Sequence, residues 1–119
     1  MIDTPIYRKI NQALGQRKTV FIVITDNDFN KENTIAVCNE AQSQLAGLVV
    51  EILYFDINDK SESEFIKLLQ IKNTTEMPLT LVINVQGIVT GKHTGIPEME
   101  NLVEDARKRM SNQCGCGCG

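Results

Sequence analysis

Two continuously apolar, β-branched segments constrain the fold most strongly. Residues 19–25 read Thr-Val-Phe-Ile-Val-Ile-Thr, and residues 48–55 form a second run of this kind. Strands that are covered on both faces have this pattern, and they belong to sheets with helices on either side. Between the two runs, apolar residues follow helical spacing over residues 35–45. A strand, a helix and a strand joined by short links predict a right-handed parallel βαβ unit.

The ends of the remaining helices carry capping signals. Thr4 and Pro5 predict the N-cap and the first residue of an initial helix. Ser61 and Glu64 fit a capping box for a helix after the second strand. Pro97 is expected to open the last helix.

Residues 79–85 and 88–93 predict a β-hairpin that turns at Gln86 and Gly87. The complete order is then αβαβαββα. This order predicts an α/β fold, with one mixed four-stranded sheet flanked by helices.

Length and charge narrow the class of protein further. The 119 residues fit one domain, assigned to residues 1–110, with residues 111–119 as a flexible Cys-Gly tail. A formal net charge of −3 argues against a nucleic-acid partner, because phosphate binding requires a basic face. No segment approaches the roughly 20 apolar residues that span a bilayer, so no membrane partner is expected. The N-terminus shows no signal peptide, and the expected location is cytoplasmic.

The element order, the Met77-Pro78 pair before the third strand and Gly95 after the fourth together resemble the thioredoxin superfamily, over about residues 4–110. In that family, the loop after the first central strand carries Cys-x-x-Cys at the start of a helix. Here residues 27–30 read Asn-Asp-Phe-Asn, and residues 21–23 are apolar where the family tends to keep a buried acid. The chain is therefore not expected to be a conventional thioredoxin or disulfide isomerase, and whether it is an enzyme stays open.

The resemblance also implies a binding site for an extended polypeptide. Pro78 would be cis, and the backbone of Met77 would pair with the bound segment. Asn27, Asp28 and Asn30 would lie at the same site. The alternative is that Pro78 only begins a strand, where its missing N–H group costs nothing.

The tail carries the strongest chemical signal, because Cys114, Cys116 and Cys118 occupy every second position of a glycine-spaced run. Accessible thiolates suit redox or sulfur-transfer chemistry, which requires no cofactor, since one thiol attacks and a neighbour resolves the product. The alternative for the tail itself is an incidental terminus. Cys38 differs from these three, because its place on an apolar helix face predicts a buried thiol.

Soft-metal binding is the second chemistry open to the same three cysteines. Clustered thiolates select Cu(I) or Zn. Three thiolates complete a trigonal Cu(I) site, whereas tetrahedral Zn needs a fourth ligand. His93 is the single histidine, and it would serve only if the tail folded back. Its position on a strand is more typical of a surface residue.

The reach of the tail limits its targets. The last helix should end at the pole opposite residues 27–30, and residues 111–119 extend to about 27 Å at most. The thiols could therefore barely reach the loop at residues 27–30 of their own domain. They are expected to act on a partner protein, a second copy of the chain or a metal. A third hypothesis is a non-enzymatic module that binds a peptide or protein beside Met77 and Pro78.

Overall fold

The structure, a computed structural model, describes residues 4–71 and 76–108. Within these ranges the predicted order of helices and strands is confirmed, with one added 3₁₀ turn, η1. The elements are α1 (Pro5–Gly15), β1 (Thr19–Thr25), α2 (Lys31–Gln44), β2 (Val50–Asp56), η1 (Lys60–Glu62), α3 (Ser63–Leu69), β3 (Leu79–Ile83), β4 (Val89–Thr94) and α4 (Met99–Arg107). The predicted tail, with its three cysteines, lies outside the described residues.

Helix α1 begins where the sequence places it. Thr4 is the N-cap, and its Oγ1 accepts a hydrogen bond from the backbone N–H of Tyr7 at 3.3 Å. Ile6, Ile10 and Ala13 are buried along one face. This spacing of three and four residues places their side chains in one stripe, which packs against the sheet.

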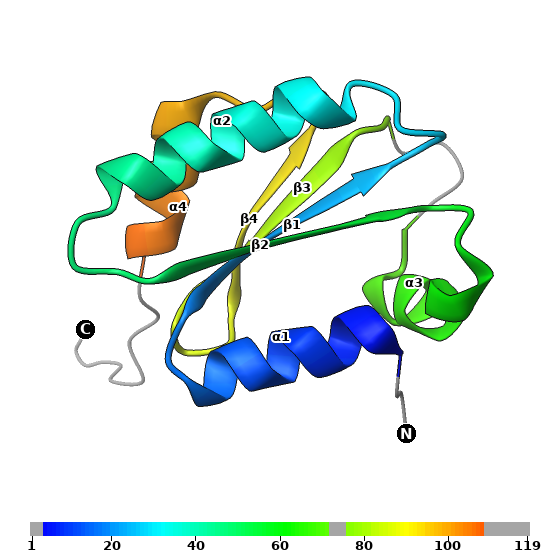
Figure 1. The fold of residues 1–119 in the computed structure, drawn as a ribbon, viewed down its shortest axis with the longest axis horizontal. Coiled ribbons are helices and arrows are strands. Elements are labelled where there is room, and N and C mark those ends of the chain that lie inside the picture. Colours follow the sequence, from blue (N-terminus) through cyan, green and yellow to red (C-terminus); the bar gives the residue numbers. More distant parts are fainter. Residues whose placement is uncertain (1–3, 72–75, 109–119) are drawn as a thin grey trace, which may run out of the picture.

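The four strands form one mixed sheet in the order β2-β1-β3-β4 (Figure 1). β1 is parallel to β2, with Thr19 opposite Val50 and Thr25 opposite Asp56. β1 is antiparallel to β3, which is antiparallel to β4. Consequently β4 runs in the same direction as β1, and the ends of β1, β2 and β4 meet the start of β3 at one edge of the sheet.

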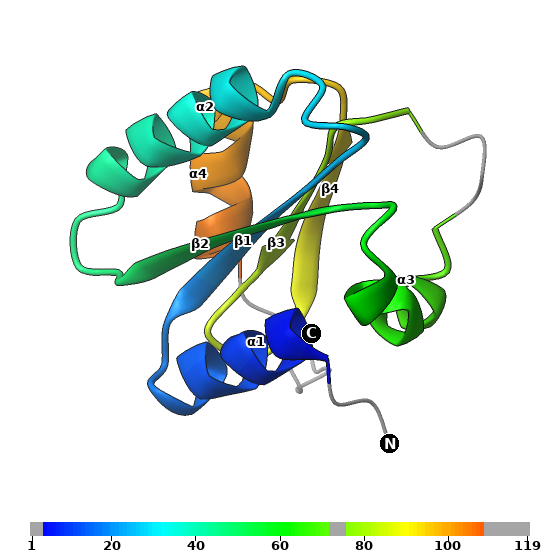
Figure 2. The ribbon, with the colours of Figure 1, turned by 45° about the vertical axis from the view of Figure 1, so that its right-hand side comes forward.

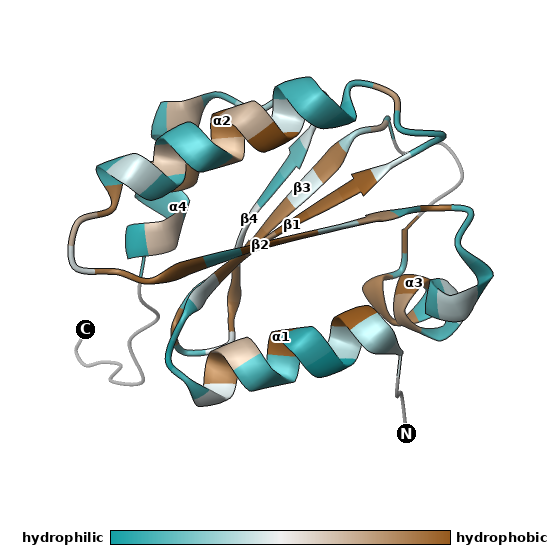
Figure 3. Cartoon of the chain, viewed as in Figure 1, coloured by the Kyte–Doolittle hydropathy of each residue, from teal (hydrophilic) through white to brown (hydrophobic). Residues whose placement is uncertain are grey.

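Helices cover both faces of this sheet. α1 and α3 lie on one face, and α2 and α4 lie on the other (Figures 1 and 2). Alternate side chains of β1 enter the two resulting cores: Val20, Ile22 and Ile24 face α1 and α3, whereas Phe21 and Val23 face α2 and α4. The apolar character of β1 between its two helical layers is visible in Figure 3.

Several predicted element ends were wrong by a few residues. β2 begins at Val50 instead of Leu48. α4 begins at Met99, after Glu98 as its N-cap, instead of at Pro97. The hairpin between β3 and β4 is confirmed, although β3 already ends at Ile83.

The earlier end of β3 has a local cause in Asn84. Its side-chain Oδ1 accepts hydrogen bonds from the backbone N–H groups of Gln86 and Ile88, at 2.9 and 3.0 Å. An asparagine side chain that binds the backbone ahead of it favours a turn over a continued strand.

The predicted capping box at Ser61 and Glu64 was also wrong. Asp59 caps this region, because its Oδ1 accepts hydrogen bonds from both the N–H and the hydroxyl of Ser61, at 2.9 and 2.6 Å. Ser61 is thus a donor within η1, and α3 starts two residues later, at Ser63. The competing acceptor Asp59 precedes Ser61 and moves the cap upstream.

β4, which is an outermost strand of the sheet, contains a bulge. Ile83 pairs with Val89 but Val82 pairs with Gly91, so Thr90 is the extra residue. The Oγ1 of Thr90 donates a hydrogen bond to the carbonyl oxygen of Asp105 at 2.7 Å. The bulge thereby ties β4 to α4.

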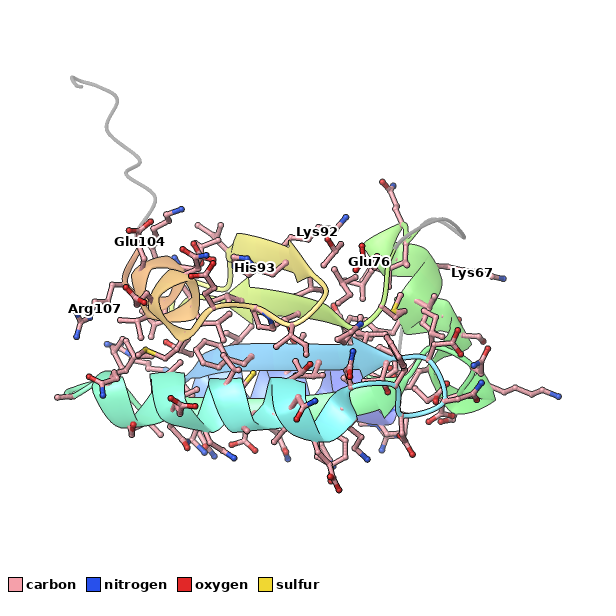
Figure 4. The ribbon with its side chains drawn as sticks, turned by 90° about the horizontal axis from the view of Figure 1, so that it is seen from above. Lys67, Glu76, Lys92, His93, Glu104 and Arg107 are labelled. Atoms are coloured by element: carbon pink, nitrogen blue, oxygen red, sulfur yellow. The ribbon has the colours of Figure 1, made fainter. Side chains whose placement is uncertain are left out.

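Gly91 leaves room beside the bulge for a buried carboxylate. A Cβ atom at Gly91 would lie 2.0 Å from Oδ2 of Asp105. Asp105 is only 6% exposed; its Oδ2 lies 2.5 Å from Nε2 of His93, and its Oδ1 lies 3.2 Å from Nζ of Lys108. Figure 4 shows His93 on β4 beside α4, which carries Glu104 and Arg107. His93 was expected at the surface; instead it is half-buried in this pair.

None of the helices in residues 4–71 and 76–108 is long and apolar enough to cross a membrane.

Gly91→Ala is expected to lower the free energy of unfolding by about 1–3 kcal/mol, because the added methyl group must displace the Asp105 carboxylate. Chemical denaturation measures this change. Gly15→Ala is the control, since a Cβ there meets no atom within 4 Å and the change should be neutral or stabilising by up to about 1 kcal/mol. Equal stability of the two variants would contradict the packing described for Asp105.

Candidate functional site

The loop after β1 adopts an unusual backbone. Asn27, Asp28 and Asn30 have φ angles of 53°, 63° and 56°, all in the left-handed region. Asn and Asp tolerate this region better than other non-glycine residues, which explains why the loop is built from them. Phe29, between them, exposes 59% of its surface. The loop thus presents an aromatic side chain on a tightly curled backbone.

Hydrogen bonds fix this loop to the end of β2. The backbone N–H of Asn27 donates to Oδ2 of Asp56 at 2.7 Å, and Nδ2 of Asn58 donates to Oδ1 of Asp26 at 3.0 Å. The backbone N–H of Ile57 also donates to the carbonyl oxygen of Thr25 at 2.7 Å. The loop is therefore held by contacts from residues about 30 positions away.

The start of α2 completes the loop without a side-chain cap. Asn30 is the N-cap, but its side chain makes no capping hydrogen bond. Its carbonyl oxygen instead accepts from both the N–H and the hydroxyl of Thr34, at 3.0 and 2.8 Å. No residue of this loop offers a sulfur nucleophile, so the loop itself performs no dithiol chemistry.

The Met77-Pro78 peptide bond is cis, as the resemblance implied. The carbonyl oxygen of Pro78 accepts a hydrogen bond from the N–H of Gly95 at 2.8 Å. Leu79, the next residue, pairs with both Ile24 and Thr94. The cis-proline segment therefore lies at the same edge of the sheet as the loop after β1, and the fold brings these two predicted parts together.

A second apolar side chain is exposed at this edge. Ile96 follows Gly95 and exposes 45% of its surface, and Met77 is half-buried against the core on the α1 side. Sequence reasoning missed both Phe29 and Ile96 as site residues. An aromatic residue inside a wholly polar loop was the available signal for Phe29, whereas the exposure of Ile96 depends on the turn at Gly95.

No acid lies beneath the loop in β1, since Phe21, Ile22 and Val23 are fully buried apolar residues. The buried acids of the described chain lie elsewhere: Glu62 is 1% exposed and Asp105 is 6% exposed. Both were missed from the sequence, because their burial depends on contacts with residues distant along the chain.

Cys38 is buried at the centre of α2 and is fully inaccessible. Burial raises the pKa of the Cys38 thiol to about 12, because the thiolate would lose its hydration. This prediction from the sequence is confirmed. The described part of the chain thus contains no accessible thiol.

Cys114, Cys116 and Cys118 lie outside the described residues, so the structure places none of them. Over residues 4–71 and 76–108, no three His, Cys, Asp or Glu side chains are arranged to hold a metal ion. His93, considered as a fourth ligand, is already bound to Asp105. The metal hypothesis therefore depends on the tail cysteines.

No protein-family model matches the sequence, and no curated protein matches it. Two solved structures are similar in fold. A thiol:disulfide interchange protein of the thioredoxin family from Chlorobium tepidum TLS superimposes with a TM-score of 0.56 at 13% identity, covering 82% of each chain. The exposed lipoprotein thioredoxin (Etrx1) of Streptococcus pneumoniae strain TIGR4 gives a TM-score of 0.53 at 15% identity, covering 79% of this chain and 88% of the other.

These matches define the class of fold: the chain has a thioredoxin-like fold, and the expectation from the sequence is confirmed. Its departure from the usual chemistry of that fold is equally plain, because the loop after β1 carries Asn27, Asp28 and Asn30 without a cysteine.

The burial of Cys38 predicts a specific pattern of thiol reactivity. In a variant with Cys114→Ser, Cys116→Ser and Cys118→Ser, a thiol reagent at pH 8 should modify no residue of the folded protein. At a pKa of about 12, only about one Cys38 thiol in ten thousand is ionised at that pH. The same variant in denaturant should react at one thiol, which serves as the control. Rapid modification without denaturant would contradict the burial of Cys38.

Proposed function

We propose that this chain is a thiol-dependent redox or sulfur-handling accessory protein. In this proposal the thioredoxin-like domain binds a partner polypeptide, and Cys114, Cys116 and Cys118 supply the chemistry. One observation carries the proposal: Cys38, which is the one cysteine in the sequence outside the tail, is buried with a raised pKa. Thiol chemistry in this chain therefore depends on the three tail cysteines.

The proposed reaction needs two of the three tail thiols. A tail thiolate attacks a sulfur of a disulfide on the partner, which forms a mixed disulfide and releases the other partner sulfur as a thiolate. A second tail thiol then attacks the mixed disulfide, which leaves an oxidised tail and a reduced partner. A Cys114–Cys118 bridge closes a larger, less strained ring than a bridge between nearest cysteines. In a reducing, cytoplasmic compartment, two small-molecule thiols would return the tail to its dithiol form by the same exchange and leave as their own disulfide.

The end of α4 supports an external target for the tail. Nη2 of Arg107 donates to the carbonyl oxygen of Gln44 at the end of α2, at 3.3 Å. α2 has 14 residues and is therefore about 21 Å long, and it starts at the loop after β1. The chain thus leaves α4 at the pole opposite this loop, which favours a partner protein or a second copy as the target.

Soft-metal binding or delivery is the second candidate, and the alternating cysteines of the tail support it. Three thiolates suit trigonal Cu(I), whereas Zn would require a fourth ligand from elsewhere. The bond between His93 and Asp105 favours Cu(I), because His93 is already engaged.

Polypeptide binding without chemistry is the third candidate, with Phe29 and Ile96 as its support. Both side chains are exposed at the edge that contains the cis Met77-Pro78 bond. An extended segment could pair with the backbone of Met77, as in other cases of strand addition, and bury these apolar groups.

Removing the tail tests the first two candidates. The full chain and a version that ends at Gln113 are purified without oxygen and compared by metal analysis and thiol counting. The redox proposal predicts no bound metal, with reversible oxidation only in the full chain. Metal bound only by the full chain, with masked thiols, would favour the second candidate. Equal behaviour of the two proteins, apart from three inert thiols, would contradict both.

Phe29→Ser tests the binding edge. Loss of an aromatic group that becomes buried on binding should weaken the affinity for a fluorescently labelled, permanently unfolded polypeptide by about tenfold or more. Fluorescence polarisation provides the measurement. Val49→Ser is the matched control, because Val49 is 61% exposed but precedes β2 at the opposite edge of the sheet. Equal affinities of the two variants would exclude the edge as the binding surface.

A further inference from the structure

A small pocket lies where β1 and β2 end, and its lining comes from the start of α1, the loop between β1 and α2, the first residue of α2, and η1. Its volume is about 270 Å³, which is below the range of about 300–1,000 Å³ for pockets that hold drug-sized ligands. The lining includes the apolar residues Pro5, Ile6 and Phe55, together with Tyr54. A ligand of this pocket is therefore short and partly apolar.

The pocket carries an excess of acidic groups. Its charged lining comprises four acidic side chains and one basic side chain: Asp28, Asp56, Asp59, Glu62 and Lys31. The resulting excess of three acidic groups attracts a cation, and the apolar wall lowers the screening by water.

Glu62 is the feature that points to a ligand. It is 1% exposed, and its Oε2 accepts a hydrogen bond from the backbone N–H of Ile6 at 3.0 Å. Its Oε1 is buried and has no hydrogen-bond partner among the described residues. Because a buried acceptor without a donor is costly, a ligand that donates an N–H group to Oε1 would relieve this cost.

Two further carboxylates are already held in place. Asp56 accepts backbone hydrogen bonds from Asn27 and Asn58, at 2.7 and 2.8 Å. Asp59 accepts from both the N–H and the hydroxyl of Ser61. Each carboxylate retains acceptor capacity for a cation, and its position is fixed before any ligand binds.

An organic cation fits this arrangement better than a metal ion. Among residues 4–71 and 76–108, no three acidic, histidine or cysteine side chains are arranged to hold a metal ion. An ammonium group on an alkyl chain donates three hydrogen bonds and lays its methylene groups against the apolar wall. We propose that this pocket binds the primary ammonium group of a short alkylamine, either a free diamine or a lysine side chain of a partner. The proposal involves no thiol and is independent of the proposed function.

Lys31 competes with such a ligand. Its Nζ lies 3.6 Å from Oδ1 of Asp28 and 4.4 Å from the centre of the Tyr54 ring. Removal of its charge would increase the negative potential of the pocket without removing any acceptor.

Calorimetric titration of the reduced full chain at low ionic strength tests the proposal, with 1,5-diaminopentane and N-acetyl-lysine N-methylamide as the two probes. Lys31→Met should tighten binding by about threefold to tenfold, because a like charge is removed. Lys18→Met is the matched control and should change nothing, since Lys18 pairs with Glu51 at the far end of β1. Glu62→Gln should weaken binding by about tenfold or more, because it keeps a carbonyl for Ile6 but loses the charge.

The two probes separate the two sources of the ligand. Binding of the diamine alone indicates a free amine, and binding of the lysine derivative indicates a protein side chain; either result supports the ammonium site. Failure of both probes to bind the folded wild type and the Lys31→Met variant would overturn the proposal. Equal tightening by Lys31→Met and Lys18→Met would also overturn it, and this comparison holds even if Glu62→Gln fails to fold.

Discussion

The structure depends on the complete burial of β1. This strand lies between β2 and β3, and all seven of its residues are buried. Its alternate side chains fill two separate cores, one under α1 and α3 and one under α2 and α4. Because full burial of each such side chain contributes about 1.5–3 kcal/mol, β1 anchors the two strands beside it and the cores under both layers of helices.

The end of β1 also positions the chemically interesting surface. The loop with Asn27 and Asn30, the cis Met77-Pro78 bond and the acidic pocket all lie near Thr25 at one edge of the sheet. Asp56 connects two of these features, since it lines the pocket and accepts a hydrogen bond from Asn27. A ligand in the pocket would therefore act next to the loop that holds Phe29.

Under the proposed function, this arrangement separates binding from thiol chemistry. In the described residues the domain offers backbone edges, exposed apolar groups and carboxylates, but its single cysteine, Cys38, is buried. Under the proposed function the reactive sulfur atoms belong to the cysteines of the tail, which follows α4 in the sequence. Such a protein would recognise a polypeptide with one surface and change the sulfur chemistry of a partner with another.

The sequence by itself determined the elements and their order, because the apolar run of β1, the helical spacing of Ile6, Ile10 and Ala13, and the Thr4 cap are patterns among residues close together in the chain. It also predicted the burial of Cys38 from its position on a helix face. Only the tertiary structure decided the pairs Glu62–Ile6 and His93–Asp105, and the missing side chain at Gly91 that admits Asp105. These contacts join residues 12 to 56 positions apart. Their existence follows from how the helices pack on the sheet, and no local pattern encodes that packing.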